Sequence, residues 1–455
     1  MMKYRYRNDD EMKDSGVEWL GKIPKGWGRT KLKYLANIKT GYTPSKADKE
    51  NYSEGGVVWV KPDDLNEFVA IKSSKERISD KGLKKQNLIP QNSVLVCCIG
   101  SIGKFGINKM PVVTNQQINA LIFNNKCFEK IRKYLIAASK EEHNKYANGN
   151  VVKILNGETQ GKIIFALSPH QEQQKIASFL DKKTSEFDTI IEKKQSLITK
   201  LTEAKKSLIS EVVTGKKQVI PPPFDKGEWK LRDRSDDEMK DSGVEWLGKI
   251  PVEWAVSKLR YLGFTKNGIS AGSDYFGSGY PFVSYGDVYK DIELPTEVKG
   301  LAKSTIEDQK NYSIEDGDVL FTRTSETIEE VGFSSTCMKT IEKSTFAGFL
   351  IRFRPIKNKL LKGFSKYYFS SSIHRSYFVK NMNLVTRASL SQELLKGLYV
   401  ILPNLQEQQL IVNFLDEKTV KIDSTIAKVK LQIEKLKEAK QSLISEVVTG
   451  KIEVL

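Results

Sequence analysis

Hydrophobic residues recur with a period of 3.5 in two long segments of the chain, residues 171–216 and 406–451. The spacing alternates between four and three residues, starting from Leu180 in the first segment and from Leu415 in the second. An apolar stripe with this period forms a seam that another helix must cover, which is typical of a coiled coil. We therefore expect two long helices that pair with each other.

These two segments are copies of one sequence at a constant offset of 235, and both end in SLISEVVTGK. A second repeat, DDEMKDSGVEWLGKIP, occupies residues 9–24 and 236–251, at an offset of 227. Each repeated unit thus consists of a leader, a middle region and a long helix. The leaders and helices are nearly identical, whereas the middle regions barely align. The two repeated units therefore share their leaders and helices but differ in their middle regions.

The middle regions alternate short apolar runs with glycine- and proline-containing turns, which predicts α/β domains. The runs at residues 57–60 and 93–99 predict strands in the first domain, and those at 281–284 and 317–323 predict strands in the second. We divide the chain into a first domain with its leader (1–167), a central helix (168–217), a proline-containing linker (218–235), a second domain with its leader (236–403) and a C-terminal helix (404–455).

The linker length favours antiparallel pairing of the helices. A helix of 46 residues is roughly 69 Å long at 1.5 Å per residue. The linker of 18 residues spans at most about 60 Å when fully extended. Parallel helices would need a connection that returns most of the helix length, and antiparallel helices need none. We expect a mixed α/β fold, with two α/β domains separated by an antiparallel two-helix coiled coil and related by a pseudo-twofold repeat.

The charge of the chain points to a polyanionic partner. The 73 Lys and Arg residues outnumber the 56 Asp and Glu residues, and the formal net charge is +17. Nucleic acid is the first candidate and an anionic membrane surface the second. No stretch approaches 18 apolar residues, so we expect no membrane span. The four cysteines have no CxxC spacing, which is typical of buried, reduced thiols in a cytoplasmic protein.

The sequence lacks the motifs of an autonomous enzyme. An amino-methyltransferase needs an Asp/Asn-Pro-Pro-Tyr/Phe loop, but the nearest match, at residues 221–224, reads PPPF. No phosphate-binding loop of an ATPase is present, and the three histidines have no metal-ligand spacing. We expect no catalytic residue, metal site or cofactor. A self-contained nuclease or methyltransferase and a coiled-coil scaffold for proteins or membranes are the alternatives.

The layout resembles the specificity subunit of type I restriction-modification systems. The resemblance rests on the motif QEQQ-x-I-x-x-FLD-x-KT at residues 171–184 and 406–419, on the two GVEWLGKIP leaders and on the order of the repeats. It implies that each variable domain is a target recognition domain reading one half of an asymmetric, two-part DNA site. It also implies that the helices act as a spacer and dock two modification (methyltransferase) subunits, which restriction (endonuclease/translocase) subunits join.

Candidate DNA-binding residues lie in predicted loops of both domains. Asn and Gln pair with adenine and Arg with guanine in the major groove, and Lys and Arg mainly hold phosphates. For each residue the alternative is a solvated loop position. The candidates in the first domain are Lys39, Thr40, Tyr42, Ser45, Lys61, Ser101, Lys104, Asn115 and Gln116. Those in the second domain are Lys266, Ser273, Tyr285, Arg323, Thr324, Ser325 and Arg387. The candidates for partner binding are Gln171, Glu172, Phe179, Gln406, Glu407 and Phe414.

Overall fold

The computed structural model describes residues 3–84, 86–149, 152–223, 227–325, 331–381 and 388–455, leaving aside the side chains of Ser325 and Ala388. These residues form two compact units. Unit 1 runs to Gln195 and also contains Lys430–Leu455, and unit 2 comprises Ser196–Val429. Each unit therefore combines one α/β domain, here called domain 1 or domain 2, with part of both long helices.

The two long helices form as the periodicity predicts. Helix α5 spans His170–Val213 and helix α11 spans Leu405–Val448, with 44 residues each. Asn404 precedes α11, and its side-chain oxygen accepts a hydrogen bond from the amide of Glu407 at 2.9 Å. After each helix a glycine adopts a left-handed conformation, with φ of +74° at Gly215 and +77° at Gly450. Both helices thus end where a residue without Cβ is needed.

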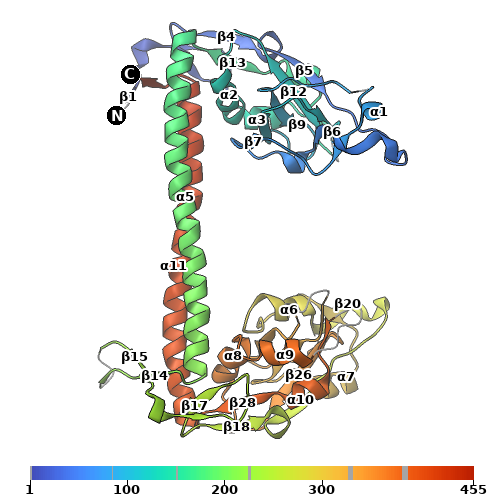
Figure 1. Ribbon diagram of the computed structural model, residues 1–455, viewed down its shortest axis with the longest axis vertical. Helices are drawn as coiled ribbons and strands as arrows, with labels where there is room; N and C mark the ends of the chain where they lie inside the picture. Colours follow the sequence, from blue (N-terminus) through green and yellow to red (C-terminus); the bar gives the residue numbers. More distant parts are fainter. Residues whose placement is uncertain (1–2, 85, 150–151, 224–226, 326–330, 382–387) are drawn as a thin grey trace. The chain divides into compact units, whose positions relative to one another are not determined.

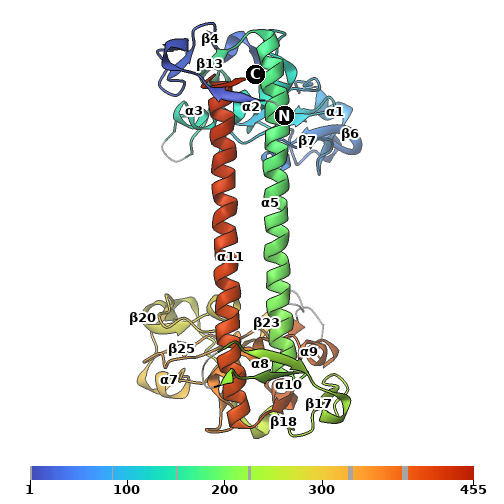
Figure 2. The same ribbon diagram turned by 90° about the vertical axis from the view of Figure 1, so that its left-hand side faces the viewer.

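Within each unit the two helices lie side by side and antiparallel (Figures 1 and 2). In unit 1, Lys440 Nζ lies 2.6 Å from Asp188 of the facing helix, and Lys194 Nζ donates to Gln432 at 2.7 Å. The residue numbers of α11 therefore decrease as those of the facing α5 residues increase, so the two helices are antiparallel. In unit 2, Lys205 of α5 pairs with Asp423 of α11 at 2.6 Å. The predicted seam positions are buried or half-buried throughout both helices, so the expected antiparallel coiled coil is confirmed within each unit.

Domain 1 is built on a five-stranded sheet in the order β5-β12-β9-β10-β7, beside a three-stranded sheet in the order β11-β6-β8. Side chains alternate between the two faces of β9. Val94 and Val96 face α2 and the long helices, whereas Leu95 and Cys97 face the smaller sheet. The strands of unit 1 are β1 (Tyr4–Tyr6), β2 (Met12–Asp14), β3 (Lys22–Pro24), β4 (Gly28–Lys31), β5 (Ala36–Thr40), β6 (Tyr52–Val60), β7 (Ala70–Ile71), β8 (Arg77–Ile78), β9 (Val94–Cys97), β10 (Phe105–Asn108), β11 (Val113–Thr114), β12 (Ile118–Phe123), β13 (Ile164–Leu167) and β29 (Ile452–Val454). Its shorter helices are α1 (Asp80–Leu83), α2 (Arg132–Ala138), α3 (Lys140–Lys145) and α4 (Gly157–Gln160).

Domain 2 has a four-stranded sheet in the order β19-β26-β22-β24. Helix α8 covers one face, where Phe364 and Phe369 share a core with Phe321, and α6 covers the other, where Val288 packs with Leu320. The strands of unit 2 are β14 (Lys217–Ile220), β15 (Lys230–Asp233), β16 (Met239–Asp241), β17 (Lys249–Pro251), β18 (Ala255–Lys258), β19 (Gly263–Asn267), β20 (Phe276–Val283), β21 (Leu301–Ala302), β22 (Val319–Thr322), β23 (Thr324–Ser325), β24 (Ser334–Thr336), β25 (Thr345–Phe346), β26 (Leu350–Pro355), β27 (Ala388–Ser389) and β28 (Tyr399–Leu402). Its shorter helices are α6 (Tyr285–Lys290), α7 (Ile306–Asn311), α8 (Lys362–Ser370), α9 (Arg375–Asn381) and α10 (Gln392–Gly397).

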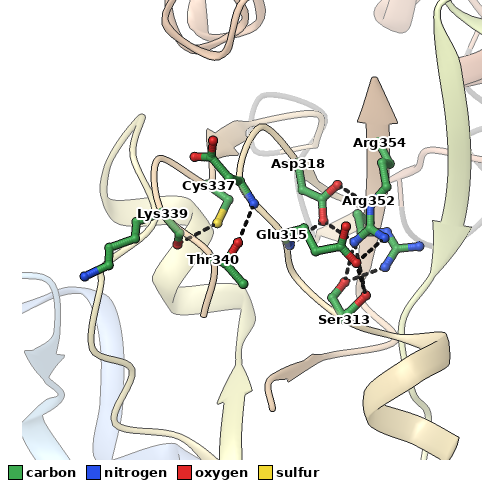
Figure 3. Close-up of polar contacts among 9 residues, drawn as sticks. Ser313, Glu315, Asp318, Cys337, Lys339, Thr340, Arg352 and Arg354 are labelled. Atoms are coloured by element: carbon green, nitrogen blue, oxygen red, sulfur yellow. Dashed lines mark hydrogen bonds and ion pairs between the residues drawn. The ribbon is translucent and has the colours of Figure 1, made fainter. Parts of the chain in front are cut away.

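The side chains of the two sheets also differ at half-buried strand positions. In domain 2 the Arg354 guanidinium binds the buried Asp318 carboxylate through Nε at 2.7 Å and a terminal nitrogen at 2.6 Å, and also contacts Glu315 at 2.6 Å (Figure 3). The strand registers align Arg354 with Ile122 of domain 1, because these residues face Phe264 and Asn37, which are 227 positions apart. An ionic cluster of domain 2 thus replaces an apolar position of domain 1.

The segment between α5 and the second leader contains two strands that pair with each other. Strand β14 pairs antiparallel with β15, so that Lys217 faces Asp233 and Ile220 faces Lys230. In unit 1 the equivalent ladder joins β29, which follows α11, to β1. The same pairing therefore accompanies the end of a long helix in both units, although the two strands are adjacent in sequence only in unit 2.

Candidate nucleic-acid interface

Three neighbouring strands of domain 1, β5, β12 and β9, each have one end at the same edge of the sheet. Thr40, the last residue of β5, faces Asn119 of β12. The first residue of β12, Ile118, faces Cys97, the last residue of β9. The loops 41–45, 98–104 and 114–117 therefore leave from the same edge, which we call the loop edge of domain 1. The antiparallel register places residues far apart in sequence side by side.

This register gathers the predicted residues of domain 1. Tyr42, Ser45, Ser101 and Gln116 are exposed on the three loops, and the Thr43 hydroxyl hydrogen-bonds the Gln116 side chain between two of them. Thr40 is exposed at the end of β5, where its hydroxyl donates to Asn119 at 2.8 Å. Such a row of hydroxyl and amide groups can exchange hydrogen bonds with base edges or phosphates.

The two predicted lysines at this edge are half-buried and already have partners. Lys61 follows β6, pairs with Glu76 and lies with its Nζ 5.2 Å from the centre of the Trp59 ring. Lys104 Nζ donates to the carbonyl of Pro62 at 2.8 Å. Lys39 is also half-buried, within β5 itself. These ammonium groups bring positive charge to the edge, although Lys61 shares its charge with a carboxylate.

Asn115 is 5% exposed, and its side chain is used inside the loop. Its amide nitrogen donates to Gln117 Oε1 at 2.9 Å, and its oxygen accepts from the Gln117 backbone amide at 3.2 Å. The Asn115 side chain therefore shapes the loop, whereas its neighbour Gln116 is exposed. The sequence could not separate the two, because burial of one amide in an Asn-Gln-Gln run depends on the strands beneath it.

A cleft of about 590 Å³ opens beside the 98–104 loop. Ser101 and Lys104 line it together with Lys140 and Asn144 of α3. Lys140 binds Glu67 at 2.6 Å, and the Asn144 amide donates to the carbonyl of Ile102 at 3.3 Å. The sequence analysis did not select Lys140 and Asn144, since only the packing of α3 against the loop brings them there.

Domain 2 presents a matching loop edge. The last residue of β19, Asn267, faces Ile351, and the last residue of β22, Thr322, faces Leu350 of the same strand β26. The loops 268–275, 323–325 and 346–349 leave from this edge. The two domains therefore offer loops at corresponding places of corresponding sheets.

The predicted residues of domain 2 occupy this edge and its surroundings. Lys266 Nζ lies 4.6 Å from the centre of the Tyr312 ring. A terminal nitrogen of Arg323 donates to the carbonyl of Gly348 at 3.4 Å, while its buried Nε finds no acceptor among the described residues. Thr324 pairs with Ser389 through the backbone of β23 and β27. The edge thus carries a cation whose hydrogen-bonding capacity is only partly used.

The remaining predicted residues of domain 2 divide into two groups. Ser273 is exposed, and Tyr285 begins α6 with its ring stacked on Tyr289 at 6.0 Å. The side chain of Ser325 and the whole of Arg387 lie outside the described residues.

A glycine at the same repeat position tightens both edges. A Cβ on Gly41 would lie 2.2 Å from the carbonyl oxygen of Thr114, and one on Gly268 would lie 2.2 Å from that of Ala347. These distances are far below van der Waals contact, so each glycine permits a close approach of two backbones. The sequence offers a signal for this pair, since the two positions differ by 227, the offset of the leaders.

The predicted partner-binding residues of the helices are largely engaged within their own units. Glu172 accepts hydrogen bonds from Arg7 at 2.7 Å and from Trp27 Nε1 at 2.8 Å. Phe179 is 1% exposed in the core of unit 1. Their counterparts in unit 2 have the same roles. Glu407 binds Arg234 at 2.8 Å and Trp254 at 2.7 Å, and Phe414 is 1% exposed. Only Gln171 and Gln406 of the predicted set are exposed.

Other polar residues of the repeated helix motif also point inward. Asp181 accepts hydrogen bonds from Lys133 at 2.6 Å and from the Tyr134 hydroxyl at 2.7 Å. Gln173 accepts from the amide of Phe128 at 2.7 Å. Asp416 and Gln408 make the equivalent contacts in unit 2. These contacts dock each helix onto its own domain, which explains why the motif is repeated. The sequence alone could not show whether these residues contact their own domain or a partner protein.

The described residues offer little nucleophilic or metal-binding chemistry. All four cysteines are buried, and burial raises the pKa of Cys98, Cys127 and Cys337 to about 12. Thiols with such pKa values are inert at neutral pH. The described residues contain no group of His, Cys, Asp and Glu that could hold a metal ion. Among the described helices, none is long and apolar enough to cross a membrane.

Known proteins share this arrangement. A family model described as the type I restriction modification DNA specificity domain matches residues 24–200 and again residues 251–435, well over half of the chain. The chain belongs to this family. Each match covers one domain together with part of the long helix that follows it, so the internal repeat corresponds to two copies of the specificity domain.

Curated relatives and a solved structure agree with this assignment. The MjaIX specificity subunit of Methanocaldococcus jannaschii is 30% identical over 197 residues, which cover 42% of this chain and 43% of the relative. The HindI specificity subunit of Haemophilus influenzae is 31% identical over 176 residues, covering 36% and 37%. The matched region thus spans under half of either relative. A solved structure from a study of complex assembly and conformational transition of the type I R-M system aligns with a TM-score of 0.66 at 15% identity, over 94% of this chain and 99% of the other, and shows the same fold.

Proposed function

We propose that the chain recognises a two-part, asymmetric DNA site, with each loop edge reading one half. This proposal rests on one observation. The two loop edges lie at equivalent ends of corresponding sheets in domains 1 and 2, and they present different side chains. Domain 1 offers Thr40, Tyr42 and Gln116, whereas the aligned region of domain 2 offers Arg323. Identical contents would suit a symmetric site, and different contents suit an asymmetric one.

The charges and polar groups at both edges suit duplex DNA. Lys39, Lys61, Lys104, Lys266 and Arg323 would mainly hold phosphates and so position the duplex. Exposed amides and hydroxyls such as those of Gln116 and Ser101 would read bases. Ser45, Ser273, Tyr285 and Thr324 would add contacts from the flanks of the two edges.

The long helices would act as a spacer and as the docking surface for two modification (methyltransferase) subunits, which restriction (endonuclease/translocase) subunits would join. Exposed helix positions, among them Gln171 and Gln406, would contact the partners. Because Glu172, Phe179, Glu407 and Phe414 hold the helices on their own domains, they would support this surface from beneath. In this arrangement the chain contributes recognition, and its partners contribute methyl transfer and cleavage.

The proposal is tested by co-expressing the chain with its modification subunit and sequencing adenine methylation in the genomic DNA of the host. The expected result is a motif of two different halves separated by a fixed number of unread base pairs. Replacing residues 27–166 by the corresponding region of another specificity subunit should change one half and leave the other intact. A stable complex that methylates without a motif, or that yields a single continuous one, would contradict the proposal.

A further inference from the structure

The loop edge of domain 2 carries exposed aromatic side chains that the sequence analysis did not select. Phe333 and Phe349 are 42% and 62% exposed, although both belong to loops next to buried strands. Their carbonyls accept hydrogen bonds from two consecutive amides at the end of β22. Thr322 donates to Phe333 at 2.8 Å and Arg323 donates to Phe349 at 2.9 Å. The two phenylalanines therefore flank the end of one strand.

A third ring extends this group. The Tyr289 ring lies 5.3 Å from the Phe333 ring, at an interplanar angle of 80°, and is 45% exposed. We call Tyr289, Phe333 and Phe349 the aromatic patch. Single exposed hydrophobic residues are common on protein surfaces, but rings gathered on one edge indicate a surface that another molecule covers.

Domain 1 has polar residues at the aligned positions. The registers align Ile351 with Asn119, because these residues face Asn267 and Thr40, which are 227 positions apart. Counting back two residues aligns Phe349 with Gln117.

The registers of the neighbouring strands align Phe333 with Lys104. Phe321 and Val96 face the aligned residues Ile351 and Asn119, and they in turn face Ser334 and Phe105. The residues directly before these two are Phe333 and Lys104. An amide and an ammonium of one edge are thus replaced by two phenyl rings on the other.

The chemistry of these rings restricts what they can read. A phenyl ring has no hydrogen-bonding group, so it cannot distinguish the donors and acceptors of guanine, cytosine or adenine. The C5-methyl group of thymine is the apolar feature of the major groove, and aromatic side chains contact it. Arg323 follows Thr322 directly, so a cation for a neighbouring phosphate lies beside the patch.

We propose that domain 2 reads thymine methyl groups of its half-site through Phe349 and Phe333, with Tyr289 supporting Phe333. This inference rests on the proposed function and specifies the chemistry of one half. Domain 1 reads its half by hydrogen bonds, and domain 2 adds apolar contact. The two halves therefore respond differently to removal of thymine methyl groups.

The test uses the assembled complex of the full chain with its modification subunit and duplexes carrying the motif found by methylation sequencing. Each thymine is replaced in turn by deoxyuridine, which differs only by the methyl group. Burying one methyl group is worth roughly 0.8 kcal/mol, or about fourfold in affinity. We expect losses of this size at one or more positions of the domain 2 half, and smaller losses in the domain 1 half.

Two variants assign the effect to the patch. Phe349→Ala should bind thymine and deoxyuridine duplexes equally at the affected position. Phe264→Ala is the matched control. Phe264 is 71% exposed on the same sheet, but near the start of β19, away from the loop edge. This variant should keep the full difference between the two duplexes.

Two outcomes would overturn the inference while leaving the two-part motif in place. They are equal binding of all deoxyuridine duplexes by the unsubstituted chain, and an unchanged deoxyuridine effect in Phe349→Ala. Absence of any two-part motif would instead overturn the proposed function itself.

Discussion

Substituting Gly41 by alanine tests the link between the loop edge and half-site recognition. The added Cβ would lie 2.2 Å from the Thr114 carbonyl oxygen and 2.3 Å from that of Asn115. Ordinary contact begins near 3.4 Å, so the loops 41–45 and 114–117 must separate by at least about 1 Å. A hydrogen bond of about 2.9 Å does not survive such a shift.

The expected effect is local and confined to one half-site. Overpacking costs about 1–3 kcal/mol of folding free energy, which a domain with this core should tolerate. Losing one base contact at about 1–3 kcal/mol reduces discrimination in one half by roughly fivefold to 150-fold. Gly268→Ala should have the same effect on the other half, because its Cβ would lie 2.2 Å from the Ala347 carbonyl oxygen.

The assay is selection of methylated sites from a randomised DNA library by the complex of each variant with the modification subunit. The matched control is Gly28→Ala in domain 1, since a Cβ at this position meets nothing within 4 Å. This control should return the unaltered motif. Recognition of both half-sites unchanged in Gly41→Ala, or both weakened equally while the thermal stability is retained, would refute the link between this loop edge and one half-site.

Three further predictions follow from buried and helical features. Burial lowers the pKa of His143 to about 4, below the value of about 6.5 in an unfolded chain. The unfolded state therefore binds the proton first, and stability should fall as pH drops from about 6.5 to 4, by about 3 kcal/mol for this group. Thermal unfolding of His143→Asn should show a shallower acid limb, and an equally steep one would count against this assignment. Glu172→Ala leaves Trp27 Nε1 without its acceptor, so it should destabilise unit 1 by about 1–3 kcal/mol in urea unfolding, whereas Gln171→Ala at an exposed site should change little. Inserting seven residues after Gln195 and seven at the facing position of α11 should lengthen the spacer by about 3 base pairs, at 1.5 Å per residue and 3.4 Å per base pair; an unchanged spacer in the selected sites would rule out the helices as the ruler.

The regular parts of the fold follow from the sequence because local patterns determine them. The periodic repeated segment 171–216 and the glycine at 215 define α5 to within a few residues. The short strands that hold Val58 and Val94 are equally visible as apolar runs. Antiparallel pairing could be inferred from lengths alone. A parallel arrangement would need a connection that runs back along most of a 44-residue helix, and an antiparallel one does not.

The site was predictable only where exposure could be guessed from residue type. Gln116 and Asn115 have the same chemistry in the sequence, yet one is exposed and the other is 5% exposed. Phe349 reads as a core residue in the sequence but is 62% exposed. Glu172 reads as a surface charge, yet it binds Trp27 and Arg7. In each case long-range strand register or leader packing decides the role, and neither is encoded in a local pattern.

The central claim is that two different loop edges read two different halves of one site. Sequencing the methylated adenines made by the chain with its modification subunit, and by a version in which residues 27–166 are exchanged, tests it most directly. The account predicts a two-part motif with a fixed spacer, in which the exchange alters one half and preserves the other half and the spacer. A motif in which both halves change together would contradict independent reading by the two domains.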